Sequence, residues 1–532
     1  MTKFIFLIIL LKFMRKEILI AAIAIILILC GGVFAASNMQ IADIATFSLN
    51  AIDLEDRGSL IVDSEDITAS KGYYNSSASD ENVVLVKNYS LRLSNSIVNK
   101  TGDTGSSGDD ADFYGINSAV LVNSNGSVEL SDVEIETNSK GSNGVFVTNA
   151  VSDSNSNSSS SSGSPIVDST ERHDGKSDAE EPGGVPPEKP VEDGPSVYGG
   201  SSGGKGALSD GNQSMPAPGA SSSDVEGSSS ADISNVRITT HGDKSRGLDA
   251  TFGGKIIASD VEINTDGQSC AALATDRGEG EVHVKNCILN TGVDEKSGRG
   301  SPIIYSTGNI TADNSEGCAH VSQIACIEGK NSIALSNCEF SAGAGGNRED
   351  NGEYVDLGGV FIYQSMSGDA DVGTSLFDAN CCVLSIEEDS EYYKTAPMFH
   401  VTNTKAIVKL ASTELNFGSG VLLNVSGQSQ WGTVGSNGGE LEFDASDEIL
   451  DGDVFVDSIS SLNMSLASTS FIGAVNPDDD FGETNLVIDS DSDWTLDGDS
   501  HLSSLENNGD IDYNGHTLYV DGKAYTESNP FK

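Results

Sequence analysis

The chain has 532 residues, of which 80 are acidic and 29 are basic, and its formal charge is −51. Binding to a phosphate backbone requires clustered Lys and Arg, so this charge excludes a nucleic-acid partner. Hydrophobic residues make up 37% of the chain, which is sparse for a globular core but sufficient for the thin interior of stacked β-coils.

The N-terminal segment, residues 1–37, has the composition of a targeting sequence. The basic residues Arg15 and Lys16 precede an apolar stretch from Ile18 to Ala36 that ends in small residues suited to cleavage. This layout predicts a signal peptide; a retained signal anchor is the alternative, because the stretch is just long enough to span a bilayer. In either case we expect the remaining chain to be secreted or displayed on the cell surface, with membrane contact only through this segment.

The next segments differ in composition. Residues 38–80 show no clear repeat, and we expect them to cap the first coil, whose edge would otherwise be unpaired. Residues 81–151 carry short alternating runs such as Ser127-Val128-Glu129-Leu130, separated by Asn-Gly or Ser-Asn turns, which predict the strands and corners of the first coils. Residues 152–231 are rich in Ser, Pro, Gly and acidic residues, so we expect a disordered insertion whose removal leaves the coils folded.

Short apolar segments recur through the main body, residues 232–522. The shortest steps, from Leu248 to Ala272 and from Ile303 to Cys326, are 24 and 23 residues. A repeat of this length, built from short β-type runs, is typical of a solenoid in which each coil buries its apolar side against its neighbours. Residues 523–532 are expected to form a C-terminal tail. The sequence therefore predicts an all-β protein, a parallel β-helix with a long disordered insertion.

Several motifs recur in order at coil spacing: Phe113-Tyr114-Gly115-Ile116-Asn117, Ser245-Arg246-Gly247-Leu248-Asp249-Ala250, Ala274-Thr275-Asp276-Arg277-Gly278, Ile304-Tyr305-Ser306-Thr307-Gly308, Ile327-Glu328-Gly329-Lys330-Asn331 and Tyr363-Gln364-Ser365-Met366-Ser367-Gly368-Asp369. With these motifs the chain resembles a secreted, adhesin-like family of right-handed parallel β-helix proteins within the pectate-lyase-like superfamily. The resemblance covers roughly residues 60–522. It implies a right-handed solenoid in a microbial surface or secreted protein, and members of this family mostly lack a demonstrated activity.

Cysteine usage gives no sign of a metal or disulfide framework. Seven cysteines follow the N-terminal segment, an odd number, and no Cys-x-x-Cys pair suggests zinc. Cys287 and Cys338 occupy the slot held by Val133 and Val261 in two copies of Ser-Asp-Val-Glu-Ile. We therefore expect these two cysteines to be small inward-facing core residues.

Polar and aromatic residues end the first strand of several successive coils. They form the candidate ligand-binding stripe: Asp276, Arg277, Tyr305, Glu328, Lys330, Tyr363 and Gln364. Stacked coils would place these side chains on neighbouring levels, within reach of an extended polymer, where Tyr305 and Tyr363 could stack on sugar rings. The alternative is that coil corners are polar because they meet water, with Asp276–Arg277 and Glu328–Lys330 as ordinary surface ion pairs.

The sequence gives weaker support for a catalytic site than for a ligand-binding site. Asp276 and Glu328 could act as general acid and base, but the Asn-Thr-Asp, Asp-Asp and Gly-His-Gly set of polygalacturonases is missing, so no catalytic residue is assigned. The alternating carboxylates Asp489, Asp491 and Asp493 could bind Ca²⁺, yet they lack the Gly and Glu of an EF-hand loop, and a solvated acidic turn is favoured. We expect no other cofactor.

These observations favour a non-enzymatic extracellular adhesion or surface-interaction protein that engages a glycan or the surface of a host or neighbouring cell. One alternative is a polysaccharide lyase or glycoside hydrolase that acts in a groove of the β-helix. A third interpretation is a structural component of a surface coat.

Overall fold

The structure is a computed structural model that describes residues 54–105, 108–150, 227–293, 300–345, 348–350, 353–355 and 357–532. All of them belong to one compact unit, Ile52–Lys532. The predicted signal segment 1–37, residue 151 and residues 152–226 of the predicted insertion lie outside the described residues. In the part that the structure describes, no helix has the length and hydropathy needed to cross a bilayer.

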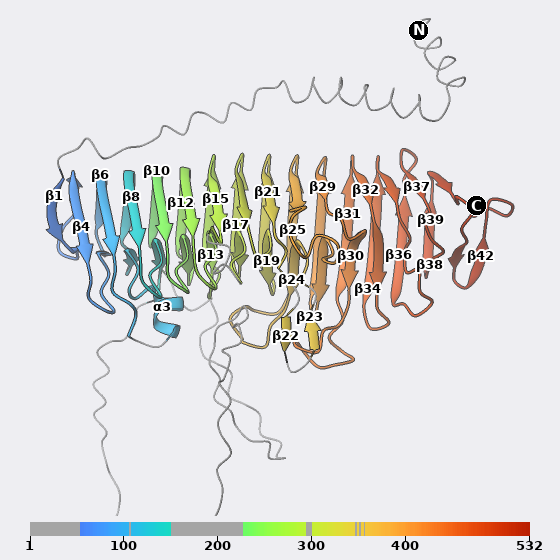
Figure 1. The fold of residues 1–532 in the computed structure, drawn as a ribbon, viewed down its shortest axis with the longest axis horizontal. Helices are drawn as coiled ribbons and strands as arrows, with labels where there is room; N and C mark the ends of the chain where they lie inside the picture. Colours follow the sequence, from blue (N-terminus) through green and yellow to red (C-terminus); the bar gives the residue numbers. More distant parts are fainter. Residues whose placement is uncertain are drawn as a thin grey trace, which may run out of the picture. The chain divides into compact units, whose positions relative to one another are not determined.

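Most strands of the described residues belong to two long parallel sheets (Figure 1). Sheet 1 contains 21 strands: β1 (Glu55–Gly58), β3 (Ile67–Ser70), β4 (Gly72–Ser76), β6 (Ser90–Lys100), β8 (Ser127–Thr137), β10 (Ser230–Thr240), β12 (Lys255–Thr265), β14 (Glu281–Lys285), β15 (Ile288–Thr291), β17 (Asn309–Asp313), β18 (Glu316–Ala319), β20 (Ser332–Ser336), β21 (Glu339–Ala342), β25 (Thr374–Asn380), β26 (Val383–Ile386), β28 (Lys405–Ala411), β29 (Glu414–Asn416), β31 (Glu440–Ser446), β34 (Ser461–Ala467), β36 (Glu483–Ile488) and β39 (Ser504–Asn507). Sheet 2 contains 12 strands: β2 (Leu60–Val62), β5 (Val84–Lys87), β7 (Val120–Asn123), β9 (Val145–Thr148), β11 (Leu248–Thr251), β13 (Leu273–Thr275), β16 (Ile304–Ser306), β19 (Ala325–Glu328), β24 (Val360–Tyr363), β27 (Phe399–Thr402), β30 (Val421–Val425) and β33 (Asp453–Val456).

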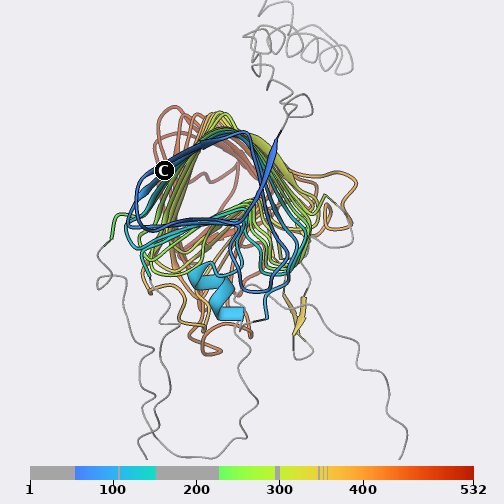
Figure 2. The ribbon, with the colours of Figure 1, turned by 90° about the vertical axis from the view of Figure 1, so that its left-hand side faces the viewer.

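The strands are arranged as stacked coils. From β2 to β31, each strand of sheet 2 is followed by one or two strands of sheet 1, as in β7 then β8 and β9 then β10. Each strand pairs in parallel with its counterpart in the next coil, β7 with β9 and β8 with β10. Figure 2, which looks along the stack, shows the coils superimposed on one another. The predicted all-β solenoid, a parallel β-helix, is therefore confirmed.

The sheet 1 strands bend at a residue with left-handed backbone. In the first coils the bend residues are Asn95, Asp132, Asn235 and Asp260, with φ of 48°, 55°, 52° and 56°. Asn and Asp tolerate this conformation because their short polar side chains form local hydrogen bonds. They also bond across coils: Asn286 Nδ2 donates to Asp260 Oδ1 at 3.2 Å, and Asn314 Nδ2 donates to Asn286 Oδ1 at 2.8 Å.

The residue after each bend points into the core. Val133 and Val261 are fully buried at this position, and Cys287 and Cys338 are each 2% exposed. All four belong to the hydrophobic core that runs through the solenoid. The prediction that the two cysteines replace valine as core residues is confirmed.

The N-terminal boundaries differ from the prediction. Part of the segment expected to be a cap, residues 54–80, instead forms coil strands, since Leu60 pairs with Val84 and Ile67 with Leu91. Residues 38–53 lie outside the described residues. Strand β10 begins at Ser230, inside the range expected to be disordered, because its parallel pairing with β8 starts at that residue.

The C-terminal end is a cap and not a free tail. The last coils complete two small sheets: β32 (Ile449–Asp451), β35 (Ser470–Ile472), β37 (Asp493–Thr495) and β40 (Asp510–Asp512) form one, and β38 (Ser500–Leu502), β41 (Leu518–Val520) and β42 (Lys523–Tyr525) form the other. Strand β42 pairs antiparallel with β41, and the backbone N–H of Phe531 donates to Tyr513 Oη at 2.8 Å. The predicted tail thus covers the edge of β41, which would otherwise be open to further pairing.

The outer side of sheet 2 is covered along much of its length. All four residues of β7, β9, β11, β19, β24 and β27 are buried, on both sides of the sheet. Part of the cover is helix α3 (Gly108–Tyr114), which Figure 2 shows beside the coils. Its Phe113 packs with Phe252, and its backbone carbonyl accepts a hydrogen bond from Thr251 Oγ1 at 2.9 Å. A small antiparallel hairpin, β22 (Arg348–Asp350) and β23 (Glu353–Val355), extends from another connection.

Candidate functional site

The predicted stripe lies on the outer side of sheet 2. Tyr305 is in β16, Glu328 ends β19 and Tyr363 ends β24, where it is registered directly beside Glu328. Asp276 follows β13, and Gln364 follows β24. The structure therefore brings these residues together on neighbouring coils, as the repeat predicted.

The stripe is, however, covered by loops from other coils. Tyr363 and Glu328 are fully buried, and Tyr305 is only 6% exposed. Tyr305 and Tyr363 belong to a second apolar cluster that also contains Leu357 and Trp431, and the ring centroids of Tyr363 and Trp431 lie 5.1 Å apart. The two tyrosine rings are therefore inaccessible for stacking on sugar rings. Unbroken apolar runs such as Val360–Tyr363 are the sequence signal for a strand buried on both faces.

Glu328 is held in a buried hydrogen-bond network. Tyr305 Oη donates to Glu328 Oε2 at 2.8 Å, and Ser365 Oγ donates to Glu328 Oε1. Burial raises the pKa of Glu328, although the bonds from Ser365 and Tyr305 oppose the shift. Gln364 is 7% exposed and donates to the Ala370 carbonyl at 3.2 Å. These contacts fix the loop after β24 over the sheet.

Asp276 belongs to an ionic cluster beneath α3. Arg246 contacts three carboxylates, with N···O distances of 2.7 Å to Asp276, 3.0 Å to Asp112 and 3.7 Å to Asp249. Burial raises the pKa of Asp276 to about 6, against the opposing effect of Arg246. Burial and the neighbouring Asp276 also raise the pKa of Asp249. The cluster joins α3 to sheet 2, and its members Arg246, Asp249 and Asp112 were not predicted from the sequence.

The two cationic stripe residues, half-buried Arg277 and exposed Lys330, have partners other than those expected. Arg277 pairs with Asp369, and its guanidinium lies 3.8 Å from the centroid of the Phe113 ring. Lys330 pairs with Glu279 at 2.5 Å and with Asp371 at 3.1 Å. The alternative of Asp276–Arg277 and Glu328–Lys330 pairs is therefore wrong, because loop carboxylates approach from other coils. The other stripe residues form a buried polar layer, and its carboxylates already have protein partners.

The three residues predicted to bind calcium do not converge on one site, and Asp489 instead accepts hydrogen bonds within its own turn. Asp489 accepts hydrogen bonds from Ser492 Oγ at 2.6 Å and from the Asp491 N–H at 3.0 Å. The bond from Ser492 is the main cause of the lowered pKa of Asp489. Asp493 accepts from Ser470 Oγ of the preceding coil at 2.8 Å. Asp489, Asp491 and Asp493 do not form a cluster with metal-binding geometry.

An open pocket of about 760 Å³ lies beside β21, β26 and β29. Its lining includes the half-buried rings of Tyr393 and Phe417, the polar side chains of Ser385 and Asn416, and four carboxylates, those of Glu387, Glu388, Asp389 and Asp451. The ring of Tyr393 lies against Gly418, where an added Cβ would be 2.2 Å from it. We call this cavity the β26–β29 pocket.

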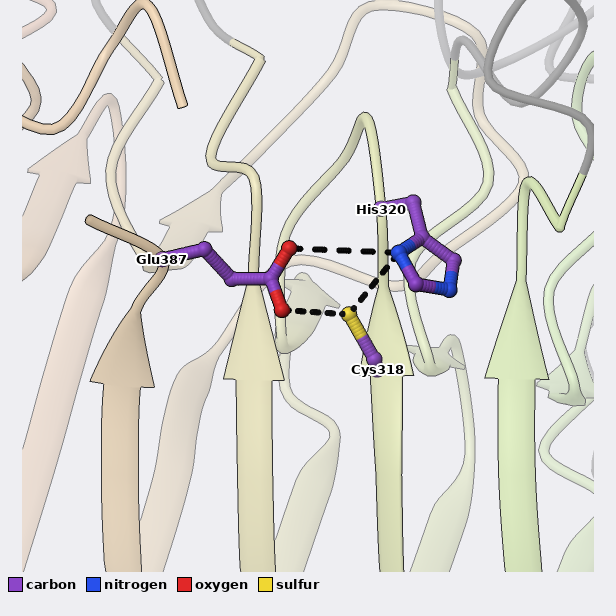
Figure 3. A group of neighbouring side chains, drawn as sticks. All are labelled: Cys318, His320 and Glu387. Atoms are coloured by element: carbon purple, nitrogen blue, oxygen red, sulfur yellow. Dashed lines mark hydrogen bonds and ion pairs between the residues drawn. The ribbon is translucent and has the colours of Figure 1, made fainter. Parts of the chain in front are cut away.

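Three side chains that were not predicted to combine meet beside this pocket, which Glu387 also lines. Cys318 lies on β18, His320 follows that strand and Glu387 follows β26; Figure 3 shows the three side chains pointing toward one another. Cys318 Sγ is 3.4 Å from His320 Nδ1 and 3.2 Å from Glu387 Oε1, and His320 Nδ1 is 3.8 Å from Glu387 Oε2. The Cys-x-His spacing signals two side chains on one strand face, but the sequence holds no signal for Glu387.

Comparisons with known proteins do not assign this site. No protein-family model matches the chain, and no curated protein is significantly similar to it.

Proposed function

We propose that this chain is an extracellular, non-enzymatic adhesion or surface-interaction protein that binds a glycan in the β26–β29 pocket. The observation that carries the proposal is the combination of rings and polar groups in this open cavity. Tyr393 and Phe417 each pack one side on the core and line the pocket. Asn416 and Ser385 supply hydrogen-bonding groups beside them. Sites of this composition suit ligands that have both apolar faces and hydroxyl groups.

The charge of the pocket narrows the ligand class. Glu387, Glu388, Asp389 and Asp451 line it, with no Lys or Arg among its lining residues. A polymer of uronic acids or sulfated sugars would bring like charges into this cavity, which costs binding free energy. The ligand that fits is a neutral or amino-sugar glycan.

Extracellular placement is supported by the sequence alone, through the basic and apolar pattern of residues 1–37. The alternative of a lyase or hydrolase loses its candidate residues, because Asp276 and Glu328 are buried under loops and bonded to protein partners. A surface-coat role has no supporting observation of its own.

The pocket is tested by substituting its two rings. Tyr393→Ala with Phe417→Ala should weaken binding of the best glycan ligand at least about tenfold, because a well-packed aromatic contact contributes 1.4 kcal/mol or more. Affinity is measured by titration calorimetry on residues 38–532. Tyr89→Ala is the matched control, since Tyr89 is also half-buried against the core but lies in the first coils. Unchanged affinity in a folded double variant would overturn the proposal.

A further inference from the structure

We propose that Cys318, His320 and Glu387 form a binding site for one divalent transition-metal ion, with zinc as the best match. The inference does not depend on the proposed glycan binding. It rests first on geometry, because one ligand atom of each side chain lies within 4.8 Å of the other two. Cys318 Sγ is 3.4 Å from His320 Nδ1, and the two Glu387 oxygens are 3.2 Å from Sγ (Oε1) and 3.8 Å from Nδ1 (Oε2). For tetrahedral zinc with sulfur, nitrogen and oxygen ligands at their usual bond lengths, these separations are about 3.3–3.6 Å. Small side-chain rotations would therefore complete the site.

The coil architecture explains how the three residues meet. Cys318 and His320 are two residues apart, so they share the outer face of one level. Glu387 lies two coils further on, one residue past the registered pair Ala342 and Ile386. Two coils span about 9–10 Å, so Glu387 must reach across the coil between them.

The coil between them carries small residues where the Glu387 side chain crosses it. Its outward residues at this level are Ser341 and Gly343. A Cβ on Gly343 would lie 2.1 Å from the carbonyl oxygen of His320, so the close approach of the two coils requires glycine. Ser341 Oγ donates to Glu387 Oε1 at 3.2 Å and orients the carboxylate. Such second-layer hydrogen bonds are typical of metal ligands.

The ligand types define the class of metal. A thiolate, an imidazole and a carboxylate suit Zn²⁺, and also Co²⁺ as its spectroscopic substitute, whereas Ca²⁺ requires six to eight oxygen ligands. On coordination Cys318 Sγ releases its proton to water and forms the metal–sulfur bond. His320 is exposed, and Cys318 and Glu387 are half-buried, so an ion can enter from solvent. Three protein ligands leave a fourth position for water or for a group bound in the adjoining β26–β29 pocket.

Metal titration of residues 38–532, freed of metal with a chelator, tests the proposal. We expect one Zn²⁺ per chain by calorimetry. With Co²⁺ we expect a thiolate-to-metal charge-transfer band and intense d–d bands of four-coordinate cobalt. Cys318→Ser should abolish the charge-transfer band, and His320→Ala or Glu387→Gln should weaken zinc binding at least about tenfold. His320 is exposed, so its substitution leaves the core intact.

Two controls are matched to the ligands. Cys381 is an exposed free cysteine, and His516 has a side-chain exposure of 36%, close to the 38% of His320. Cys381→Ser and His516→Ala should leave metal binding unchanged. The proposal is overturned by weak binding without a thiolate band, which would indicate the acidic surface alone. It is equally overturned by a band that persists in Cys318→Ser.

Discussion

Glu448 is the ionisable member of a column of hydrogen bonds at one corner of the coils. The backbone N–H of Thr413 donates to Glu448 Oε1 at 2.8 Å, and the backbone N–H of Glu448 donates to Thr469 Oγ1 at 3.3 Å. Thr469 in turn donates from its backbone to Ser492 Oγ at 2.9 Å. Glu448 is 3% exposed, and burial raises the pKa of its carboxyl to about 7, although the bond from Thr413 opposes this shift.

This raised pKa predicts a pH-dependent stability. Between the ordinary value of 4.5 and about 7, the folded chain binds the Glu448 proton more tightly than the unfolded chain does. The contribution of Glu448 to the free energy of unfolding therefore falls as the pH rises through this window. Glu448→Gln keeps the acceptor and removes the charge, so it should raise Tm at about pH 8 and change it little at about pH 4. A Tm difference that is the same at both pH values would contradict this reading.

The tyrosines of the stripe are also more deeply buried than Tyr393 of the pocket. Tyr363→Ala removes a fully buried ring that stacks on Phe361 with centroids 4.6 Å apart, and it should cost about 3–5 kcal/mol of unfolding free energy. Tyr393→Ala removes a half-buried ring and should cost clearly less. Denaturant titration of the two variants checks this order. Equal costs would mean that the loops do not cover the stripe.

At the scale of elements, the insertion begins and ends at one corner of a coil, between β9 and β10. Asn149 Oδ1 accepts a hydrogen bond from the Ser229 N–H at 2.9 Å, and Asn125 Oδ1 accepts from the Ser228 N–H at 2.9 Å. The two ends of the segment are thus held side by side. Strand β10 pairs with β8 of the preceding coil from Ser230 onward, so the stacking is continuous across the insertion.

Deleting residues 150–227 should leave the solenoid folded. The deletion joins Asn149 to Ser228 and leaves three residues between β9 and β10, the same number as in 124–126 between β7 and β8 and in 252–254 between β11 and β12. Loop-closure entropy favours the shorter connection, so Tm should be equal or higher. Circular dichroism and thermal unfolding measure the result. Loss of the β signal would show that the insertion supplies part of a coil.

The coils were predictable from sequence, whereas the cover over sheet 2 was not. Alternation and Asn or Asp corners are local signals, which is why the slot of Cys287 and Cys338 could be assigned from Val133 and Val261. The loops that bury Tyr363 come from distant segments, such as the one that carries Trp431. The meeting of Cys318 with Glu387 likewise depends on which coils become neighbours. Insertions of different lengths make the sequence spacing between coils irregular, so this neighbourhood cannot be read from the repeat.

At the scale of the whole molecule, the repeated coils supply a core, and connections between particular coils supply the distinctive surfaces. The formal charge of −51 keeps nucleic acids and other polyanions away. The β26–β29 pocket shares this acidic character, which is why we expect neutral or amino-sugar ligands. Its two rings, Tyr393 and Phe417, lie on connections whose conformation no local pattern predicts, whereas Ser385 and Asn416 lie on β26 and β29.

The most direct test of the account is binding of residues 38–532 to a broad glycan array, with and without Ca²⁺. We predict selective binding to neutral or amino-sugar glycans. We also predict that Ca²⁺ does not change this binding, because Asp489, Asp491 and Asp493 form hydrogen bonds within the protein and do not converge on a calcium site. Absence of binding under both conditions, or binding restricted to uronic-acid or sulfated polymers, would contradict the proposed function of the pocket.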